Sequence, residues 1–287
     1  MVRSSRSLPY LLLLPGILLS VAILYPFLTG AYWSFTRYDL GSGAPPSFNG
    51  IANYVRLLTN GLGLHAILIT FVYAALAVAV ETILGFGVAL LLLKEGPLTS
   101  VFRALVVLPL LMPPVVATIM WKVMMTPNGV LNYLLQQVGL PPFGWLGTTA
   151  TALPSTVLID AWIYTPFVIL ILLAGLQSIP DDVREAARVD GANWWWEQSH
   201  IIIPLLRPFF VIIVVFRGID ALKSFDIIYT STQGGPINAT MNLHVQAYFT
   251  GIRSLNIGAA MAFLVILWAF CYALAFGLLR LRRGRPA

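Results

Sequence analysis

Charged residues are scarce in this sequence. Asp, Glu, Lys and Arg make up only 10% of the 287 residues, while apolar residues make up 59%. Average soluble proteins carry about 25% charged and about 45–50% apolar residues. A soluble domain of this length needs a charged surface over its core, so this composition excludes an ordinary soluble domain.

Cysteine and histidine are scarce as well. The single cysteine, Cys271, lies inside an apolar run, so no disulfide is expected. His65, His200 and His244 are far apart and show no Cys/His ligand spacing, so we expect no metal site. The net charge of +6 comes from basic residues at the ends of apolar runs, not from a patch interleaved with aromatics. Nucleic acid is therefore not an expected partner.

Motifs for nucleotide binding and catalysis are missing. The three lysines are Lys94, Lys122 and Lys223, and none follows a glycine as a phosphate-binding P-loop requires. No Ser/His, Cys/His or clustered-carboxylate arrangement is visible, so the chain is not expected to be an enzyme. We also find no internal repeat of the kind that marks inverted-repeat secondary transporters.

Long apolar runs dominate the chain instead. A helix needs about 20 mostly apolar residues to cross the hydrocarbon core of a bilayer. The sequence predicts an all-α integral membrane protein with six transmembrane spans at 8–36, 66–93, 102–125, 153–176, 205–229 and 257–280. The first run is too long for a signal peptide and has no small-residue cleavage site, so we expect it to be permanent.

The basic residues near the span ends predict the orientation. With the N-terminus inside, the cytoplasmic set comprises Arg3, Arg6, Lys94, Arg103, Arg184, Arg188, Arg207, Arg280, Arg282, Arg283 and Arg285. The opposite side carries only Arg37, Arg56, Lys122 and Arg253. Cytoplasmic loops of membrane proteins are enriched in Lys and Arg. Both termini of a multi-pass protein in the cell membrane are therefore expected on the cytoplasmic side.

Segment 177–204, between the fourth and fifth spans, has the features of a short cytoplasmic helix. Pro180 suits a first helical turn, and Asp181 and Asp182 complement the positive helix end. Gly191 can adopt the left-handed conformation that closes a helix. Two interpretations remain open from these residues alone: a solvated connection, or a helix that docks into a protein groove.

The same segment resembles a known motif. Glu185-Ala186-Ala187, then three residues, Gly191, nine residues and Ile201-x-Ile203-Pro204 are similar to the EAA loop of binding-protein-dependent ABC importer permeases. In that family the loop is the coupling helix that docks on a separate ATPase subunit. The resemblance implies a coupling set of Glu185, Ala186, Ala187, Asp190, Gly191, Ile201 and Pro204. Gln198 stands where relatives usually carry an aromatic residue, and Trp194, Trp195 and Trp196 are expected to supply that packing.

Other segments resemble the carbohydrate permeases of this family, the maltose type. Segment 225–240, FDIIYTSTQGGPINAT, is similar to the stretch after their fifth span, and the likeness covers about 102–279. The resemblance implies the ABC importer permease (MetI-like) fold and import of a sugar or sugar-like solute (oligosaccharide, polyol or glycerol-phosphate-like). It also implies a second, usually non-identical, permease, two copies of a cytoplasmic ATPase that bind ATP and Mg, and an extracytoplasmic solute-binding protein.

Several charges fall inside the predicted spans: Glu81, Asp160, Arg217, Asp220, Lys223 and Asp226. Each costs at least about 2.5–3.5 kcal/mol at the bilayer centre, so each needs a partner or a polar route. On one ideal helix, Arg217, Asp220, Lys223 and Ser224 fall within an arc of about 120°. The residues leave an ion-pair ladder and a solute pathway open. Glu81 is expected to form a buried hydrogen bond to a neighbouring span.

The resemblance favours the pathway, because maltose-type permeases bind sugar with the matching stretches of the fourth and fifth spans. It implies a substrate set of Ile163, Tyr164, Phe167, Arg217, Asp220, Lys223 and Ser224. Aromatic faces can stack on a sugar ring, although Trp162 suits interhelical packing as well. Two other functions stay open: import of amino acids or peptides, and proton-coupled transport through Glu81 and Asp160.

Overall fold

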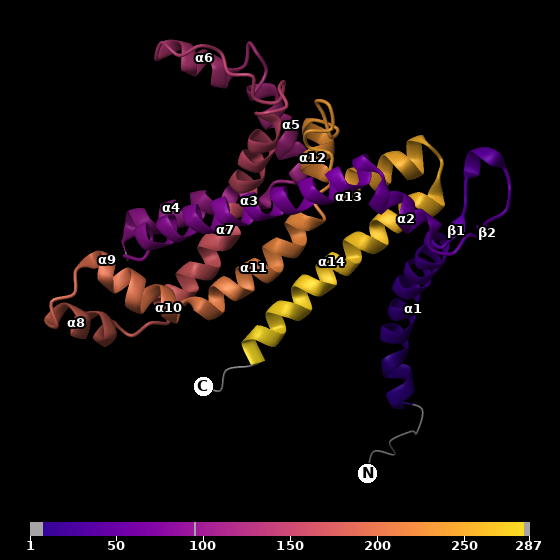
Figure 1. Cartoon of the computed structure of the whole chain (residues 1–287). Helices are drawn as coiled ribbons and strands as arrows, with labels where there is room; N and C mark the ends of the chain where they lie inside the picture. Colours follow the sequence, from indigo (N-terminus) through magenta and orange to yellow (C-terminus); the bar gives the residue numbers. More distant parts are fainter. Residues whose placement is uncertain (1–7, 95, 284–287) are drawn as a thin grey trace. The chain divides into compact units, whose positions relative to one another are not determined.

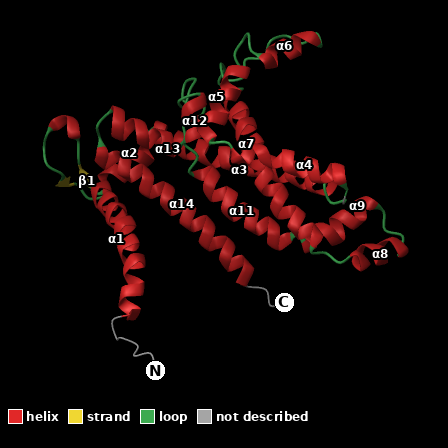
Figure 2. Cartoon of the chain, turned by 180° about the vertical axis from the view of Figure 1, so that it is seen from behind, coloured by secondary structure: helices red, strands yellow, loops and turns green. Residues whose placement is uncertain are grey.

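The computed structural model describes residues 8–94 and 96–283, which divide into two compact units. The first unit holds residues up to 64 together with 246–266, and the second holds 65–245 with the stretch from 267 onward. Helices account for most of the described chain (Figure 2). Arg3, Arg6 and Arg285, on which the predicted orientation partly rests, lie outside the described residues.

The first unit holds helix α1 (Leu8–Ser34) and a small polar cap at its end. The antiparallel strands β1 (Thr36–Arg37) and β2 (Ser47–Phe48) flank the 3-10 turn η1 (Leu40–Ser42), and helix α2 (Ala52–Thr59) follows. Asn53 donates to the carbonyls of Ser34 and Thr36, both at 2.9 Å, and so ties α2 to the end of α1. The unit also contains the π-helix η4 (Phe249–Arg253).

Three helices of the second unit pack around a common core. They are α3 (Gly61–Leu91), α7 (Ala152–Gln177) and α11 (Arg207–Leu222), with α3 entering the unit at His65. Leu172 and Leu176 of α7 are fully buried with Ile213 of α11 in one hydrophobic cluster. Gly85 of α3 permits close approach, since a Cβ built there would lie 2.6 Å from Cγ1 of Val168. Helix α7 is therefore the central element of the unit.

The remaining helices are mostly short, and α13 and α14 contain residues of both units. They are α4 (Pro97–Val107), η2 (Leu108–Leu111), α5 (Pro114–Met124), α6 (Val130–Gln137), α8 (Asp181–Val189), α9 (Trp194–Glu197), the π-helix η3 (Gln198–Ile202), α10 (Ile203–Leu205), α12 (Asp226–Ser231), α13 (Leu243–Tyr248) and α14 (Ile257–Arg283). Figure 1 shows α8 and α9 at one end of α7 and α5, α6 and α12 at its other end.

Two of the predicted spans are not single straight helices. Within the described residues, four helices are long and apolar enough to cross a membrane: Leu12–Ser34, Gly61–Leu91, Ala152–Gln177 and Ile257–Leu278. The predicted span 102–125 is instead a pair, Pro97–Leu111 and Pro114–Met124, bent by 97°. Proline at 113 and 114 removes two backbone donors and forces Met112 into an extended conformation, so the helix breaks there.

The predicted span 205–229 is broken at both ends. Segment 194–205 meets α11 at 64°, and α11 ends at Leu222 rather than continuing to 229. Two backbone carbonyls left free by this ending receive tertiary partners. Nδ2 of Asn242 donates to the carbonyl of Ser224 at 2.5 Å, and Nδ1 of His244 lies 2.7 Å from that of Lys223. Irregular backbone at membrane depth needs such partners.

Candidate functional site

A buried ion cluster joins the three core helices of the second unit. Arg217 of α11, with its side chain only 3% exposed, donates from Nε and Nη2 to the two carboxylate oxygens of Glu81, both at 2.7 Å. The same Nη2 bonds Asp160 of α7 at 2.8 Å, and Nη1 bonds Asp220 at 2.6 Å. Its guanidinium also lies 3.8 Å from the ring centroid of Tyr164. Every nitrogen of this guanidinium is thus engaged with the protein.

The ion cluster confirms the prediction for Glu81. We predicted a buried hydrogen bond to a neighbouring span, and Glu81 makes two to α11. The partner is a guanidinium, which the sequence did not indicate because Glu81 and Arg217 are 136 residues apart. The interpretation of an ion-pair ladder that joins this helix to its neighbours therefore describes Arg217, since two of its three carboxylate partners lie on other helices.

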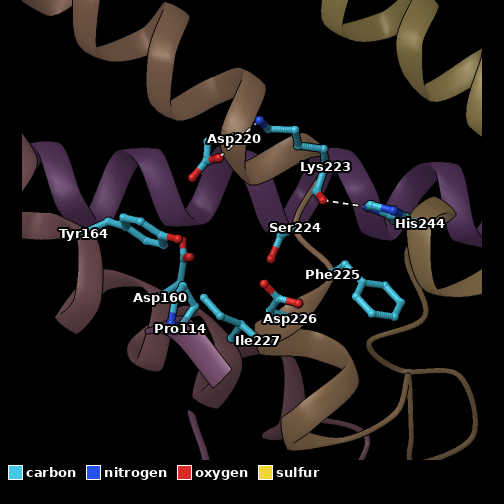
Figure 3. Close-up of a pocket in the computed structure, with 10 residues that line it drawn as sticks. All are labelled: Pro114, Asp160, Tyr164, Asp220, Lys223, Ser224, Phe225, Asp226, Ile227 and His244. Carbon is cyan, nitrogen blue, oxygen red and sulfur yellow. Dashed lines mark hydrogen bonds and ion pairs between the residues drawn. The ribbon is translucent and has the colours of Figure 1, made fainter. Parts of the chain in front are cut away.

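A cavity of about 290 Å³ opens beside the cluster. Its lining comes from α5, α7, α11, α12, α13 and the break after α11: Pro114, Asp160, Tyr164, Asp220, Lys223, Ser224, Phe225, Asp226, Ile227 and His244. Figure 3 shows the Ser224 hydroxyl and the Asp226 carboxylate pointing into the same space. A mixture of aromatic faces, hydroxyls and carboxylates is suited to holding a hydroxylated molecule.

The backbone break is what brings Ser224 and Asp226 to this cavity. On a continuous helix, Asp226 would fall outside the arc that contains Asp220 and Lys223. Because α11 ends at Leu222 and α12 begins at Asp226, the chain turns between them and both side chains line the cavity. The single-helix arc was therefore the wrong geometry, although three of its members, Asp220, Lys223 and Ser224, do meet here.

The other predicted substrate residues do not line this cavity. Ile163 is buried in a cluster with Ile159 and Ile227. Trp162 packs edge-on against Trp121, with ring centroids 5.7 Å apart, as its interhelical interpretation anticipated. Phe167 lies 6.5 Å from Phe216. Trp162 projects from a different face of α7, whereas Phe167 shares the face of Asp160 but lies about two turns further along the helix.

His244, Phe225 and Pro114 were missed as cavity residues. His244 reaches the break from α13, some 21 residues downstream of the carbonyl it contacts. Pro114 comes from α5, more than 100 residues upstream. No local sequence signal marks either position. The sequence places Asp226 outside the arc unless Gly218 or a local break rotates it, and a local break is what the structure shows.

The coupling segment forms the short helix that its sequence predicts. Helix α8 spans Asp181–Val189, begins after Pro180 and ends at Gly191, whose φ is +81°. Glu185 and Ala186 are exposed, whereas Ala187 is buried. A groove of about 490 Å³ runs along this face; its lining includes Val183, Ala186, Ala187, Asp190, Gly191 and Ile201.

The three tryptophans pack locally: Trp194 lies edge-on to Trp195, and Trp196 stacks on His200 and lines the groove along α8. Gln198 is 7% exposed, whereas Trp195 on α9 is 75% exposed and Trp194 and Trp196 are about half exposed. Glu197 is also buried, 3.7 Å from the Arg188 side chain of α8. Segment 194–198 therefore buries its polar side chains and presents its indoles outward.

The comparisons with known proteins agree with this architecture. Residues 81–285 match the family described as binding-protein-dependent transport system inner membrane component. The trehalose/maltose transport system permease protein MalF of Thermococcus litoralis is 36% identical, over 97% of this chain and 94% of its own. The trehalose transport system permease protein SugA of Mycobacterium tuberculosis is 31% identical, over 97% and 89%.

A solved structure gives the same fold. One chain in the crystal structure of a bacterial ABC transporter that imports the acidic polysaccharide alginate superposes with a TM-score of 0.82 at 21% identity, covering 97% of this chain and 96% of its own. The fold is that of an all-α ABC importer permease, as predicted. The chain belongs to the binding-protein-dependent transport system inner membrane component family. It is a multi-pass membrane permease subunit.

Proposed function

We propose that this chain forms half of the translocation pathway of an ATP-driven importer and passes a sugar through the cavity beside Tyr164, Asp220, Lys223 and Ser224. The observation that carries the proposal is this cavity, which places hydroxyl, carboxylate and aromatic groups at a helix break within a membrane-spanning core. The names of the trehalose and maltose relatives support a sugar as its solute.

The partners follow from the same family. A second permease subunit would complete the pathway, two copies of a cytoplasmic ATPase would bind ATP and Mg, and an extracytoplasmic binding protein would deliver the solute. Helix α8 is the proposed docking element for the ATPase, with Glu185 exposed on it and Gly191 closing it. Docking there requires α8 and both termini to be cytoplasmic.

Proton-coupled transport is a weaker account of the same residues. It would use Glu81 and Asp160 as proton carriers. Both carboxylates bond the single guanidinium of Arg217 and are almost fully buried. Protonating a carboxylate in a buried ion pair is costly, because it leaves the buried cation with less opposite charge beside it.

Transport by the assembled complex tests the proposal. The chain, its partner permease, the ATPase and the binding protein are reconstituted into liposomes, and uptake of radiolabelled trehalose and maltose is measured. We expect uptake that requires ATP and the binding protein. Uptake driven by a proton gradient without ATP would favour the secondary carrier. ATP-dependent uptake of an amino acid, with neither sugar accepted, would refute the sugar assignment.

A further inference from the structure

The cavity carries more negative than positive groups. Four carboxylates line it or lie directly behind its wall, namely Glu81, Asp160, Asp220 and Asp226, and two permanent cations accompany them, Arg217 and Lys223. His244 is the remaining titratable side chain with a basic group in the lining. In the exposed part of the cavity, Asp220 and Asp226 accompany Lys223, so one negative charge is in excess there when His244 is neutral.

Both cations already have carboxylate partners within the protein. Arg217 does not line the cavity, and its guanidinium is fully engaged by Glu81, Asp160 and Asp220. Lys223 reaches the cavity, but its Nζ lies 3.5 Å from a carboxylate oxygen of Asp220. An arriving carboxylate, phosphate or sulfonate would share Lys223 with Asp220 and would lie close to that carboxylate and to Asp226.

Asp226 contributes the excess. Among the residues that the structure describes, no cation lies within ion-pair distance of its carboxylate and no side chain or backbone group donates to it. The residue is exposed at the first turn of α12, where its side chain faces the cavity (Figure 3). Such a carboxylate accepts hydrogen bonds from hydroxyl groups readily and repels a second anion.

We infer that the cavity selects sugars without an anionic group, and that Asp226 is the residue that excludes uronates, sugar phosphates and sugar sulfonates. This inference rests on the proposed sugar pathway and names its substrate class. It also separates this chain from the structurally similar importer of the acidic polysaccharide alginate. The shared fold does not determine the charge of the solute, because a few side chains at one helix break decide it.

The electrostatic part can be measured without knowing the solute. Cys271, the only native cysteine, is replaced by alanine, and Ser224→Cys places a thiol in the cavity lining of the assembled complex. Labelling rates are then compared for two methanethiosulfonate reagents, one carrying trimethylammonium and one carrying sulfonate. Each rate is divided by the rate of the same reagent with free 2-mercaptoethanol, which removes the intrinsic difference between them.

We expect the normalised rate of the cationic reagent to exceed that of the anionic one by about ten-fold or more, since attraction and repulsion by the same groups both enter the ratio. Asp226→Asn keeps the shape of the side chain and should lower the ratio by about five-fold. Asp39→Asn is the matched control: it makes the same change in the first unit, where the oxygen that accepts from Gly41 is retained, and should leave the ratio unchanged.

A ratio near one, or a ratio that Asp226→Asn leaves unchanged, would overturn the inference. Failure of both Ser224→Cys and a second reporter, His244→Cys, to react would overturn the cavity itself. A second arm tests the sugar: trehalose should slow labelling of Ser224→Cys, and trehalose 6-phosphate should not. Equal protection by the phosphate would refute anion exclusion. A high ratio with no protection by either sugar would leave the charge result standing and count against the proposed sugar pathway.

Discussion

Arg217 of α11 and Glu81 of α3 form a two-pronged ion pair, with Nε and Nη2 each 2.7 Å from a different oxygen of the same carboxylate. Both side chains are almost completely buried. Paired geometry of this kind fixes the relative orientation of two helices as well as their separation. Asp160 then joins α7 to the same guanidinium, so one cation holds three helices beside the cavity.

Removal of Arg217 should be more damaging than removal of Glu81. Arg217→Gln leaves the buried Glu81 and Asp160 without a cation, whereas Glu81→Gln leaves Arg217 with Asp160 and Asp220. Breaking a buried pair costs about 3–5 kcal/mol when an uncompensated charge remains. We expect little assembled complex for Arg217→Gln and a lowered unfolding temperature for Glu81→Gln, measured on the purified complex. Lys223→Gln is the control, since its side chain is half exposed; equal losses in all three variants would contradict the cluster's structural role.

Asp220→Asn should separate assembly from transport. Asp220 is 41% exposed and shares Arg217 with two deeply buried carboxylates, so the cluster keeps most of its compensation without it. We expect normal amounts of complex and about ten-fold slower uptake, the loss of one charged hydrogen bond to the solute. Asp160→Asn, which removes a buried partner, should reduce assembly instead. Reduced assembly of Asp220→Asn with unchanged uptake per complex would favour a purely structural ladder.

The effect of substituting Gly191 should depend on how readily the new residue adopts a positive φ. Its φ of +81° is unfavourable for residues with a Cβ by about 1 kcal/mol or more. No atom lies within 4 Å of a Cβ built there, so the backbone rather than crowding limits substitution. Gly191→Val should weaken ATPase retention and uptake, and Gly191→Asn should be tolerated better because asparagine adopts this conformation more readily. Co-purification of the ATPase measures both, and indistinguishable behaviour of the two variants would argue against this role.

Glu185 offers a test of docking that leaves the helix intact. It is exposed on α8, and Glu185→Lys preserves helix propensity while reversing the charge. We expect loss of ATP-dependent uptake with the chain still in the membrane. Asp182→Asn on the same helix is a milder comparison. Full uptake and normal ATPase retention by Glu185→Lys would remove the coupling assignment.

Reporter fusions should read opposite compartments at the two ends of α7. We expect cytoplasmic signals within 181–198 and after Arg285, and external signals within 234–240 and 41–60. Within the second unit, α8 and α12 lie at opposite ends of α7 (Figure 1), which is the arrangement that one crossing of the bilayer requires. A cytoplasmic signal from 234–240 would mean that α11 and α12 together do not cross.

The helices and the coupling segment could be predicted because their signals are local. A run of apolar residues identifies a span wherever it packs, and Pro180, the acidic first turn and Gly191 specify α8 within a dozen residues. The breaks in the third and fifth spans could be predicted only in part. Prolines at 113 and 114 stop a helix by removing donors, yet segment 223–225 contains no proline or glycine, and its irregular backbone depends on Asn242 and His244 arriving from downstream.

By itself, the sequence determined that this chain crosses a membrane, that a short helix follows its fourth span and that charges in its fifth span needed partners. Tertiary structure decided which partners they received. Glu81, Asp160 and Arg217 are brought together from three helices, and the early end of α11 turns Asp226 into the cavity. The reason is the range of the forces involved. Helix formation and capping act within one or two turns, whereas pairing of a buried charge is settled among all the segments that can reach it.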